Sequence, residues 1–184
     1  MLRNEKSNPR DIDPPAKRKL ANRCLYLSTF VACMLFGGSL FAMMLYASAG
    51  GSAESILLQI RPPFKGGFTF FVIFNSSMEW LLIPATLFLN WRLRARRTPL
   101  LWGAILYYCA RAWTYIYFVP AIFKLMAVPA GTQISPELAG QIMQWVNLSW
   151  IRCAIDGVLA ALLLFATSRP VVINSDDATA IRPY

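Results

Sequence analysis

The sequence predicts an all-α membrane protein, a bundle of four transmembrane helices with both chain ends on the cytoplasmic side. The 184 residues are 57% hydrophobic and have a mean hydropathy of +0.45, which is too apolar for an ordinary soluble domain. Four apolar blocks reach the roughly 20 residues that a helix needs to cross the hydrocarbon core of a bilayer. They span about 24–49, 68–91, 100–127 and 143–167, and we expect them to form one transmembrane domain over 23–168.

The basic residues predict the orientation of these helices. They lie at the ends of the apolar blocks rather than on a face with interleaved aromatic residues, so the net charge of +9 does not indicate nucleic-acid binding. The positive-inside rule places two groups in the cytoplasm: Arg3, Lys6, Arg10, Lys17, Arg18, Lys19 and Arg23 before the first block, and Arg92, Arg94, Arg96 and Arg97 after the second. We therefore expect a multi-pass protein of the inner (plasma) membrane.

The chain begins with a segment that should not pack. Residues 1–22 mix charges with three prolines and have no apolar period, which predicts a disordered or surface-lying cytoplasmic leader in contact with membrane lipids. In the first span, the run FGGSLFA, residues 36–42, gathers small residues that let another helix approach closely. This face packs within the bundle, or it docks a second copy of the chain or another membrane protein.

Prolines and a cap mark the remaining elements. The stretch ESILLQI in the outer link 51–67 is expected to form a short interfacial helix before Pro62. Pro84 and Pro120 each remove one backbone hydrogen bond inside a span and predict a kink. Ser135 followed by Pro136 is a helix start, so the fourth helix begins outside the membrane. Residues 169–184 form a polar cytoplasmic tail.

Charged residues from three spans should meet near the middle of the membrane. At about 1.5 Å per residue from the expected boundaries, Glu79, Arg111 and Arg152 reach similar depth. Asp156 lies one turn from Arg152, and Asn75 lies one turn from Glu79. Glu79, Asp156, Arg111 and Arg152 together carry no net charge. Each ion costs roughly 2.5–3.5 kcal/mol at the centre of a helix, so such groups normally face the bundle interior and pair.

Two interpretations of this cluster remain open. The charges can be a structural salt-bridge network in a non-catalytic membrane subunit or scaffold. Alternatively, the arginines hold an oxyanion while Glu79 or Asp156 acts as a base, or the cluster binds the polar head of a lipophilic ligand. Tyr108 and Tyr115 lie too deep for interfacial anchors, and aromatic rings beside arginine can line a pocket for a flat ring.

The second half of the chain resembles a known family over about residues 99–167. Two motifs carry the resemblance: Pro120 followed by Lys124 in YFVPAIFKLMA, and Trp145 followed seven residues later by Arg152 in WVNLSWIR. Both are similar to the anthrone-oxygenase-like family of small four-helix membrane proteins. Two helical turns separate Trp145 from Arg152, so the two residues share a helix face.

The resemblance implies a site and a reaction. It implies oxidation of an electron-rich aromatic, such as an anthrone, by O₂ without metal or flavin, and histidine is indeed absent from the chain. We therefore expect no cofactor, and a small lipophilic aromatic or quinone-like ligand. Glu79 and Asp156 are the candidate catalytic residues. The candidate ligand-binding residues are Asn75, Tyr108, Arg111, Tyr115, Trp145, Ser149 and Arg152.

Overall fold

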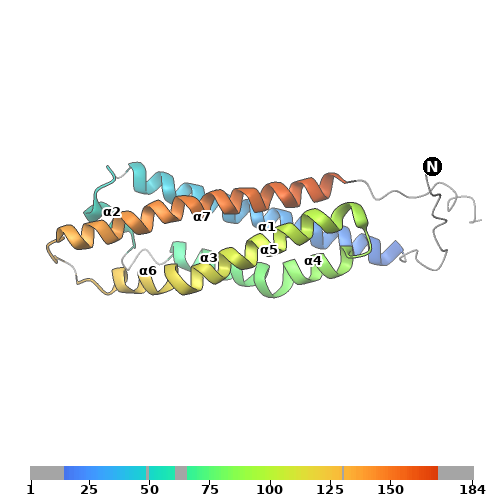
Figure 1. Ribbon diagram of the computed structural model, residues 1–184, viewed down its shortest axis with the longest axis horizontal. Helices are drawn as coiled ribbons and strands as arrows, with labels where there is room; N and C mark the ends of the chain where they lie inside the picture. Colours follow the sequence, from blue (N-terminus) through green and yellow to red (C-terminus); the bar gives the residue numbers. More distant parts are fainter. Residues whose placement is uncertain (1–14, 49, 61–65, 130, 170–184) are drawn as a thin grey trace, which may run out of the picture.

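The computed structural model describes residues 15–48, 50–60, 66–129 and 131–169, and this part of the chain is helical, without β-strands. Four long rods lie side by side in an elongated bundle (Figure 1). In chain order the elements are α1 (Pro15–Ser48), α2 (Ala53–Ile60), α3 (Gly66–Ser77), η2 (Met78–Leu82), α4 (Ile83–Asn90), α5 (Arg94–Trp113), η3 (Thr114–Phe118), α6 (Val119–Met126) and α7 (Pro136–Ser168).

Three of these rods are long and apolar enough to cross a membrane. They are Ala16–Ser48, Thr69–Asn90 and Pro136–Ser168, and they match the first, second and fourth expected spans. The fourth rod runs from Arg94 to Met126 through α5, η3 and α6, and covers most of the third expected span, 100–127. Its tyrosines, its tryptophans and Arg111 lower its hydropathy. The expected all-α fold is therefore confirmed for the described residues, with three helices suited to crossing a membrane.

Pro84 and Pro120 each follow a single π-helical turn. In η2 the backbone N–H of Ile83 bonds to the carbonyl of Met78, and in η3 that of Val119 bonds to the carbonyl of Thr114. Pro84 and Pro120 come directly after these donors. A proline has no N–H, and its ring clashes with the carbonyl four residues earlier, so the preceding turn widens. The expected disturbance at the two prolines takes this form.

The ends of the rods agree with the sequence signals in two places. The short helix expected in the outer link is α2, whose buried Ile56, Leu57 and Ile60 pack beside α6 and α7. The side chain of Ser135 accepts a hydrogen bond of 3.2 Å from the backbone of Leu138, so the predicted start of α7 is confirmed. Helix α1 starts earlier than expected, at Pro15. The rest of the leader, 1–14, and the tail 170–184 lie outside the described residues.

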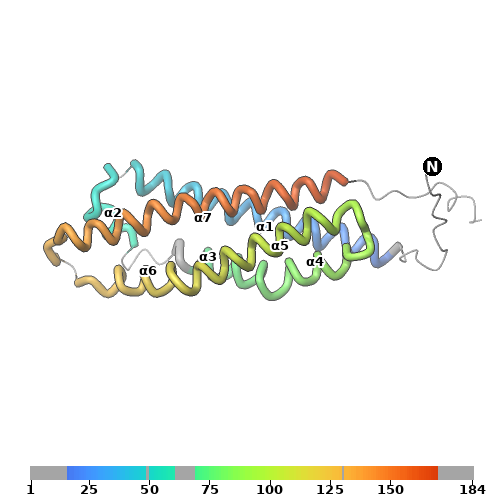
Figure 2. Tube along the Cα trace, in the orientation of Figure 1, coloured from blue at the N-terminus to red at the C-terminus, as the bar shows by residue number. Residues whose placement is uncertain are grey.

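Two apolar clusters fill the bundle, one toward each end. The cluster at the end where α4 turns into α5 (Figure 2) includes Leu25, Leu35, Met78, Leu100, Leu159 and Leu163. The cluster at the α2 end includes Ile56, Leu57, Phe118, Ile142, Trp145 and Val146. Glu79, Arg111 and Arg152 lie near the middles of their rods, between these clusters. The charged residues therefore form a polar layer near the middle of the rods, between the two apolar clusters.

Buried Arg96 joins the chain segments at the α4–α5 end. Its guanidinium donates to Asn22 Oδ1 at 2.6 Å, to Asn90 Oδ1 at 3.3 Å and to the carbonyl of Arg169 at 3.3 Å. Arg96 is thus a structural tie between α1, α4 and the end of α7, and not an exposed charge like its neighbour Arg97.

The small residues of α1 are used inside the bundle. A methyl group added at Gly38 would stand 2.7 Å from the ring of Phe70, and Ser39 is 3% exposed. A methyl group added at Gly157 on α7 would stand 3.0 Å from the ring of Phe36 on α1. Gly37 has nothing within 4 Å and remains on the surface. Gly38 and Ser39 of the small-residue run are therefore used for helix packing within the chain, whereas Gly37 is exposed.

Candidate functional site

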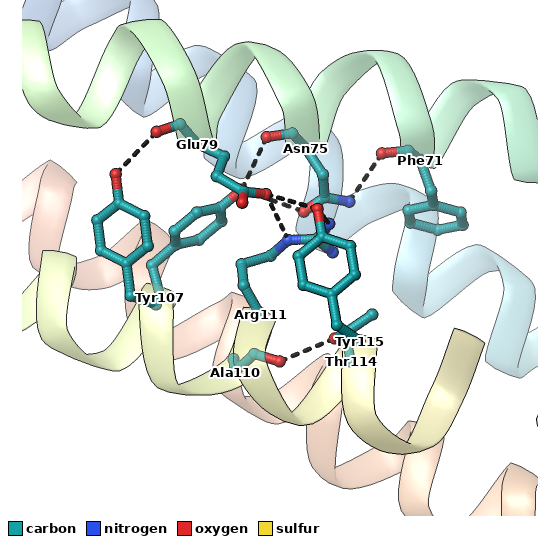
Figure 3. Close-up of polar contacts among 9 residues, drawn as sticks. Phe71, Asn75, Glu79, Tyr107, Ala110, Arg111, Thr114 and Tyr115 are labelled. Carbon is teal, nitrogen blue, oxygen red and sulfur yellow. Dashed lines mark hydrogen bonds and ion pairs between the residues drawn. The ribbon is translucent and has the colours of Figure 1, made fainter. Parts of the chain in front are cut away.

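Glu79, Arg111 and Tyr115 form a closed hydrogen-bonded triad between two antiparallel rods. Arg111 Nε donates to Glu79 Oε2 at 3.2 Å, and the Tyr115 hydroxyl donates to the same oxygen at 2.9 Å. Arg111 Nη2 donates to the Tyr115 hydroxyl at 2.8 Å. Figure 3 shows Glu79 from one helix facing Arg111 and Tyr115 from the other. The predicted pairing of Glu79 with Arg111 is therefore confirmed.

The triad leaves one acceptor of Glu79 unused. Both donors bind Oε2, and Oε1 makes no hydrogen bond with any described residue. The Glu79 and Arg111 side chains are 12% and 15% exposed, so the pair is partly but not fully enclosed. A carboxylate oxygen can accept more than one hydrogen bond, so Oε1 is available to a donor outside the protein.

Two further tyrosines bind the backbone next to Glu79. The Tyr108 hydroxyl donates to the carbonyl of Glu79 at 2.7 Å, and the Tyr107 hydroxyl donates to the carbonyl of Asn75 at 2.9 Å. The Glu79 carbonyl has no backbone donor, because Ile83 bonds to Met78 and Pro84 lacks an N–H. The π turn thus exposes a carbonyl that Tyr108 satisfies. Asn75 bonds to the carbonyl of Phe71 at 2.8 Å rather than to Glu79.

The triad lies at the outer face of the bundle. Tyr108 is 41% exposed and Tyr115 is 49% exposed, although both are near the middle of their rod. The exposed neighbours are apolar, among them Trp80 at 78% and Ile116 at 79%. At this depth such a face meets lipid tails if the rod crosses the membrane. Polar hydroxyls are therefore presented within an apolar surface.

Arg152 does not join the triad, which corrects the expectation that both arginines pair with Glu79. Its guanidinium lies 4.8 Å from the ring of Phe118 and 5.9 Å from that of Phe71, and it forms no ion pair with a described residue. The reason is geometric: Arg111 and Tyr115 on the adjacent rod already occupy Oε2, whereas Arg152 comes from α7. The closer ring offsets about 2 kcal/mol of the roughly 2.5–3.5 kcal/mol that arginine costs at mid-span.

Asp156 is held by a residue that the sequence indicated only as a small packing residue. Ser39 Oγ on α1 donates to Asp156 Oδ2 at 2.7 Å. Asp156 lies one turn from Arg152 on the same helix, yet the two do not form an ion pair. The run FGGSLFA drew attention to Ser39 only as a small residue, and nothing in its local sequence indicated a carboxylate partner on α7.

Trp145 is buried with an unsatisfied donor. It is 4% exposed and packs edge-on against Tyr46 at 5.9 Å and Phe118 at 6.3 Å between ring centroids. Its Nε1 has no hydrogen-bond partner among the described residues. The hydroxyl of Ser149, the remaining candidate, donates a hydrogen bond of 2.8 Å to the carbonyl of Trp145, within the same helix. Trp145 and Arg152 thus adjoin the same ring, that of Phe118.

Comparisons with protein-family models, with curated proteins and with solved structures found no match to this chain. The function is therefore inferred from the geometry of the polar layer in the middle of the rods. This layer consists of a neutral triad at the outer face of the bundle and, nearby, a guanidinium and an indole N–H without hydrogen-bond partners. These features define a helical protein with spans suited to a membrane and a polar layer at mid-depth.

Proposed function

We propose that this is a four-span inner-membrane protein that binds a small lipophilic aromatic or quinone-like molecule at the Glu79–Arg111–Tyr115 triad. The observation that supports it most directly is the position of Glu79 Oε1. This acceptor makes no hydrogen bond with the described residues, beside Tyr108 and Tyr115 on an apolar outer face. A ligand hydroxyl arriving through the bilayer donates to Oε1, and its ring packs on the tyrosines.

The fourth span in this proposal is the rod Arg94–Met126. It packs against α7 and α4, two elements of rods that are apolar enough to span a membrane. With this rod across the bilayer, the buried Arg96 and the exposed Arg97 lie inside and Glu137 lies outside. Both termini are then cytoplasmic, in agreement with the distribution of basic residues.

The resemblance to anthrone oxygenases extends the proposal to a reaction. The CH₂ group of an anthrone becomes a carbonyl, O₂ supplies its oxygen, and the second oxygen leaves as water. Glu79 or Asp156 removes the first proton, and Arg111 or Arg152 stabilises the resulting enolate, which reacts with O₂. Oxygen uptake with anthrone tests this step separately from binding.

A structural role for the triad is the alternative, and it has its own support. The Glu79–Arg111 pair is made at 3.2 Å, as expected of a salt bridge that fixes the order of the helices. In that case the chain is a non-catalytic subunit or scaffold, and removing the pair affects folding alone.

Native mass spectrometry and thermal unfolding of the purified protein decide between these functions. Wild type is compared with Glu79→Gln, and with Glu137→Gln as a control at an exposed site outside the bundle core. Retention of an aromatic or quinone-sized molecule by wild type and Glu137→Gln, with its loss from folded Glu79→Gln, is the expected result. No adduct on wild type, together with a much lower unfolding midpoint for Glu79→Gln, would establish the structural alternative.

Added 2-naphthol extends the comparison to a known probe. It combines a flat ring with one hydroxyl, and its partitioning is measured in nanodiscs without protein. Wild type should bind it, and Glu79→Gln should bind it about tenfold more weakly, the effect of losing one hydrogen bond to a charged acceptor.

A further inference from the structure

Two donors near the middle of the bundle have no acceptor. The indole N–H of Trp145 is buried and forms no hydrogen bond with a described residue. The guanidinium of Arg152 lies over two aromatic rings, Phe118 at 4.8 Å and Phe71 at 5.9 Å, and forms no hydrogen bond or ion pair with a described residue. Buried donors without partners are uncommon in folded proteins, and a buried cation without an anion is more so.

The two donors adjoin one surface. Trp145 and Arg152 are two turns apart on the same face of α7, and both lie against the ring of Phe118. Tyr46 of α1 covers Trp145 from another side. Arg152 is partly buried, whereas Trp145 is 4% exposed.

The neighbouring carboxylates do not satisfy these donors. Glu79 is bound by Arg111 and Tyr115, and Asp156 accepts its hydrogen bond from Ser39. The group that complements a guanidinium and an indole N–H is an acceptor with negative charge, and the aromatic walls favour an aromatic ring attached to it.

We propose that Trp145 and Arg152 form an oxyanion subsite that binds the carboxylate, phenolate or enolate oxygen of a lipophilic aromatic anion. This inference rests on the proposed function, because the same ligand enters from the membrane. It adds that the ligand carries a negative charge. The triad accepts a hydroxyl hydrogen, whereas the subsite donates to an oxyanion.

Two probes that differ in charge test the subsite. Binding of 2-naphthoate and of 2-naphthol at neutral pH is measured by equilibrium dialysis against protein in nanodiscs, with protein-free nanodiscs as the reference. The variants are Arg152→Gln, which removes the charge, and Trp145→Phe, which removes the N–H and keeps a ring. Trp113→Phe is the matched control, because Trp113 also packs on Phe118, at 5.1 Å, but is not a buried, unsatisfied donor.

The expected result is selective. Wild type and Trp113→Phe bind 2-naphthoate, Arg152→Gln binds it at least about tenfold more weakly, and Trp145→Phe binds it several-fold more weakly. All four bind 2-naphthol within about twofold of one another, which also shows that the variants are folded.

Two outcomes overturn the inference, and they differ in what else they affect. If wild type binds 2-naphthol but not 2-naphthoate, or if Arg152→Gln binds 2-naphthoate as well as wild type does, the oxyanion subsite is wrong and the proposed function stands. If wild type binds neither probe, both proposals are wrong.

Discussion

Glu79 and Tyr115 hydrogen-bond at 2.9 Å, and each is the second residue of a π turn that ends two residues before a proline. The two turns lie on antiparallel rods at the same height. Each proline therefore shapes the backbone at the point where its helix contributes a side chain to the triad. The polar contact and the two helix irregularities are one structural feature, because π turns change which residues face the neighbouring helix.

Replacing either proline by alanine should weaken ligand binding without lowering the thermal stability of the protein. Pro84→Ala and Pro120→Ala restore a backbone N–H, so the preceding turn can become α-helical and rotate Glu79 or Tyr115 out of the triad. We expect 2-naphthol binding to fall about tenfold while the thermal midpoint is unchanged or higher. Pro136→Ala, at the start of α7, is the control and should bind normally. A lower midpoint with intact binding would contradict this account.

The ion pair should show strong coupling in a double-mutant cycle. Glu79→Gln leaves Arg111 without its carboxylate in a largely enclosed position and should cost about 3 kcal/mol of unfolding free energy. Glu79→Gln combined with Arg111→Gln should cost less than the two single changes added together. Equilibrium unfolding in mixed detergent gives all four values. Additive costs would mean that the two side chains do not interact energetically.

Gly38 and Gly37 form a matched pair for the packing of α1. Gly38→Ala places a methyl group 2.7 Å from the Phe70 ring, which is itself stacked on Phe74 at 4.6 Å, and should destabilise the protein by about 1–2 kcal/mol. Gly37→Ala meets nothing within 4 Å and should be neutral or stabilising by up to about 1 kcal/mol. Measuring the thermal unfolding midpoints of Gly38→Ala and Gly37→Ala tests this prediction. Equal midpoints would show that α1 does not approach α3 this closely.

Arg96 should tolerate lysine less well than its neighbour does. Arg96→Lys keeps the charge but cannot serve Asn22, Asn90 and the Arg169 carbonyl together, so we expect a loss of about 2 kcal/mol. Arg97→Lys changes an exposed side chain and should stay within about 0.5 kcal/mol of wild type. Unfolding midpoints compare the two, and a neutral Arg96→Lys would exclude a structural tie at this end.

The position of the fourth rod can be tested by labelling from one side of the membrane. Arg97 and Glu137 are exposed; Arg97 lies in the first turn of the rod Arg94–Met126, and Glu137 lies beyond its other end, so Arg97→Cys and Glu137→Cys report on the two ends. A membrane-impermeant maleimide added to right-side-out vesicles should label Glu137→Cys at once, and Arg97→Cys only after permeabilisation. Labelling of both positions from the same side would mean that the rod Arg94–Met126 does not cross the membrane.

The sequence predicted the positions of the charged residues along the bundle axis better than it predicted their partners. Counting residues along each span correctly brought Glu79 and Arg111 together, because both face a directly adjacent antiparallel helix. It failed for Arg152, since depth does not fix the direction in which a side chain points around the helix axis. Two π turns make that direction harder to predict, because they break the regular 100° step on which spacing arguments depend.

Other contacts required the assembled bundle. Arg96 is one of four arginines in a segment typical of a cytoplasmic link. In the folded chain it is buried and donates hydrogen bonds to Asn22 and Asn90 of neighbouring rods. Ser39 was selected for its size, whereas its hydroxyl holds Asp156. Asn22 and Asp156 are 74 and 117 residues away from Arg96 and Ser39 in sequence, so local sequence patterns do not indicate these contacts.

The π turns also affect how this chain tolerates changes in length. A π turn holds one more residue than the α-helical hydrogen bonds around it require, so each of the segments 78–82 and 114–118 behaves as a one-residue insertion in its helix. Deleting a residue there would leave an unbroken α-helix of nearly the same length, and the residues before and after the turn would keep their relative orientation. Glu79 and Tyr115 lie inside the turns themselves, so the polar layer of this protein depends on the number of residues in each helix as well as on their type.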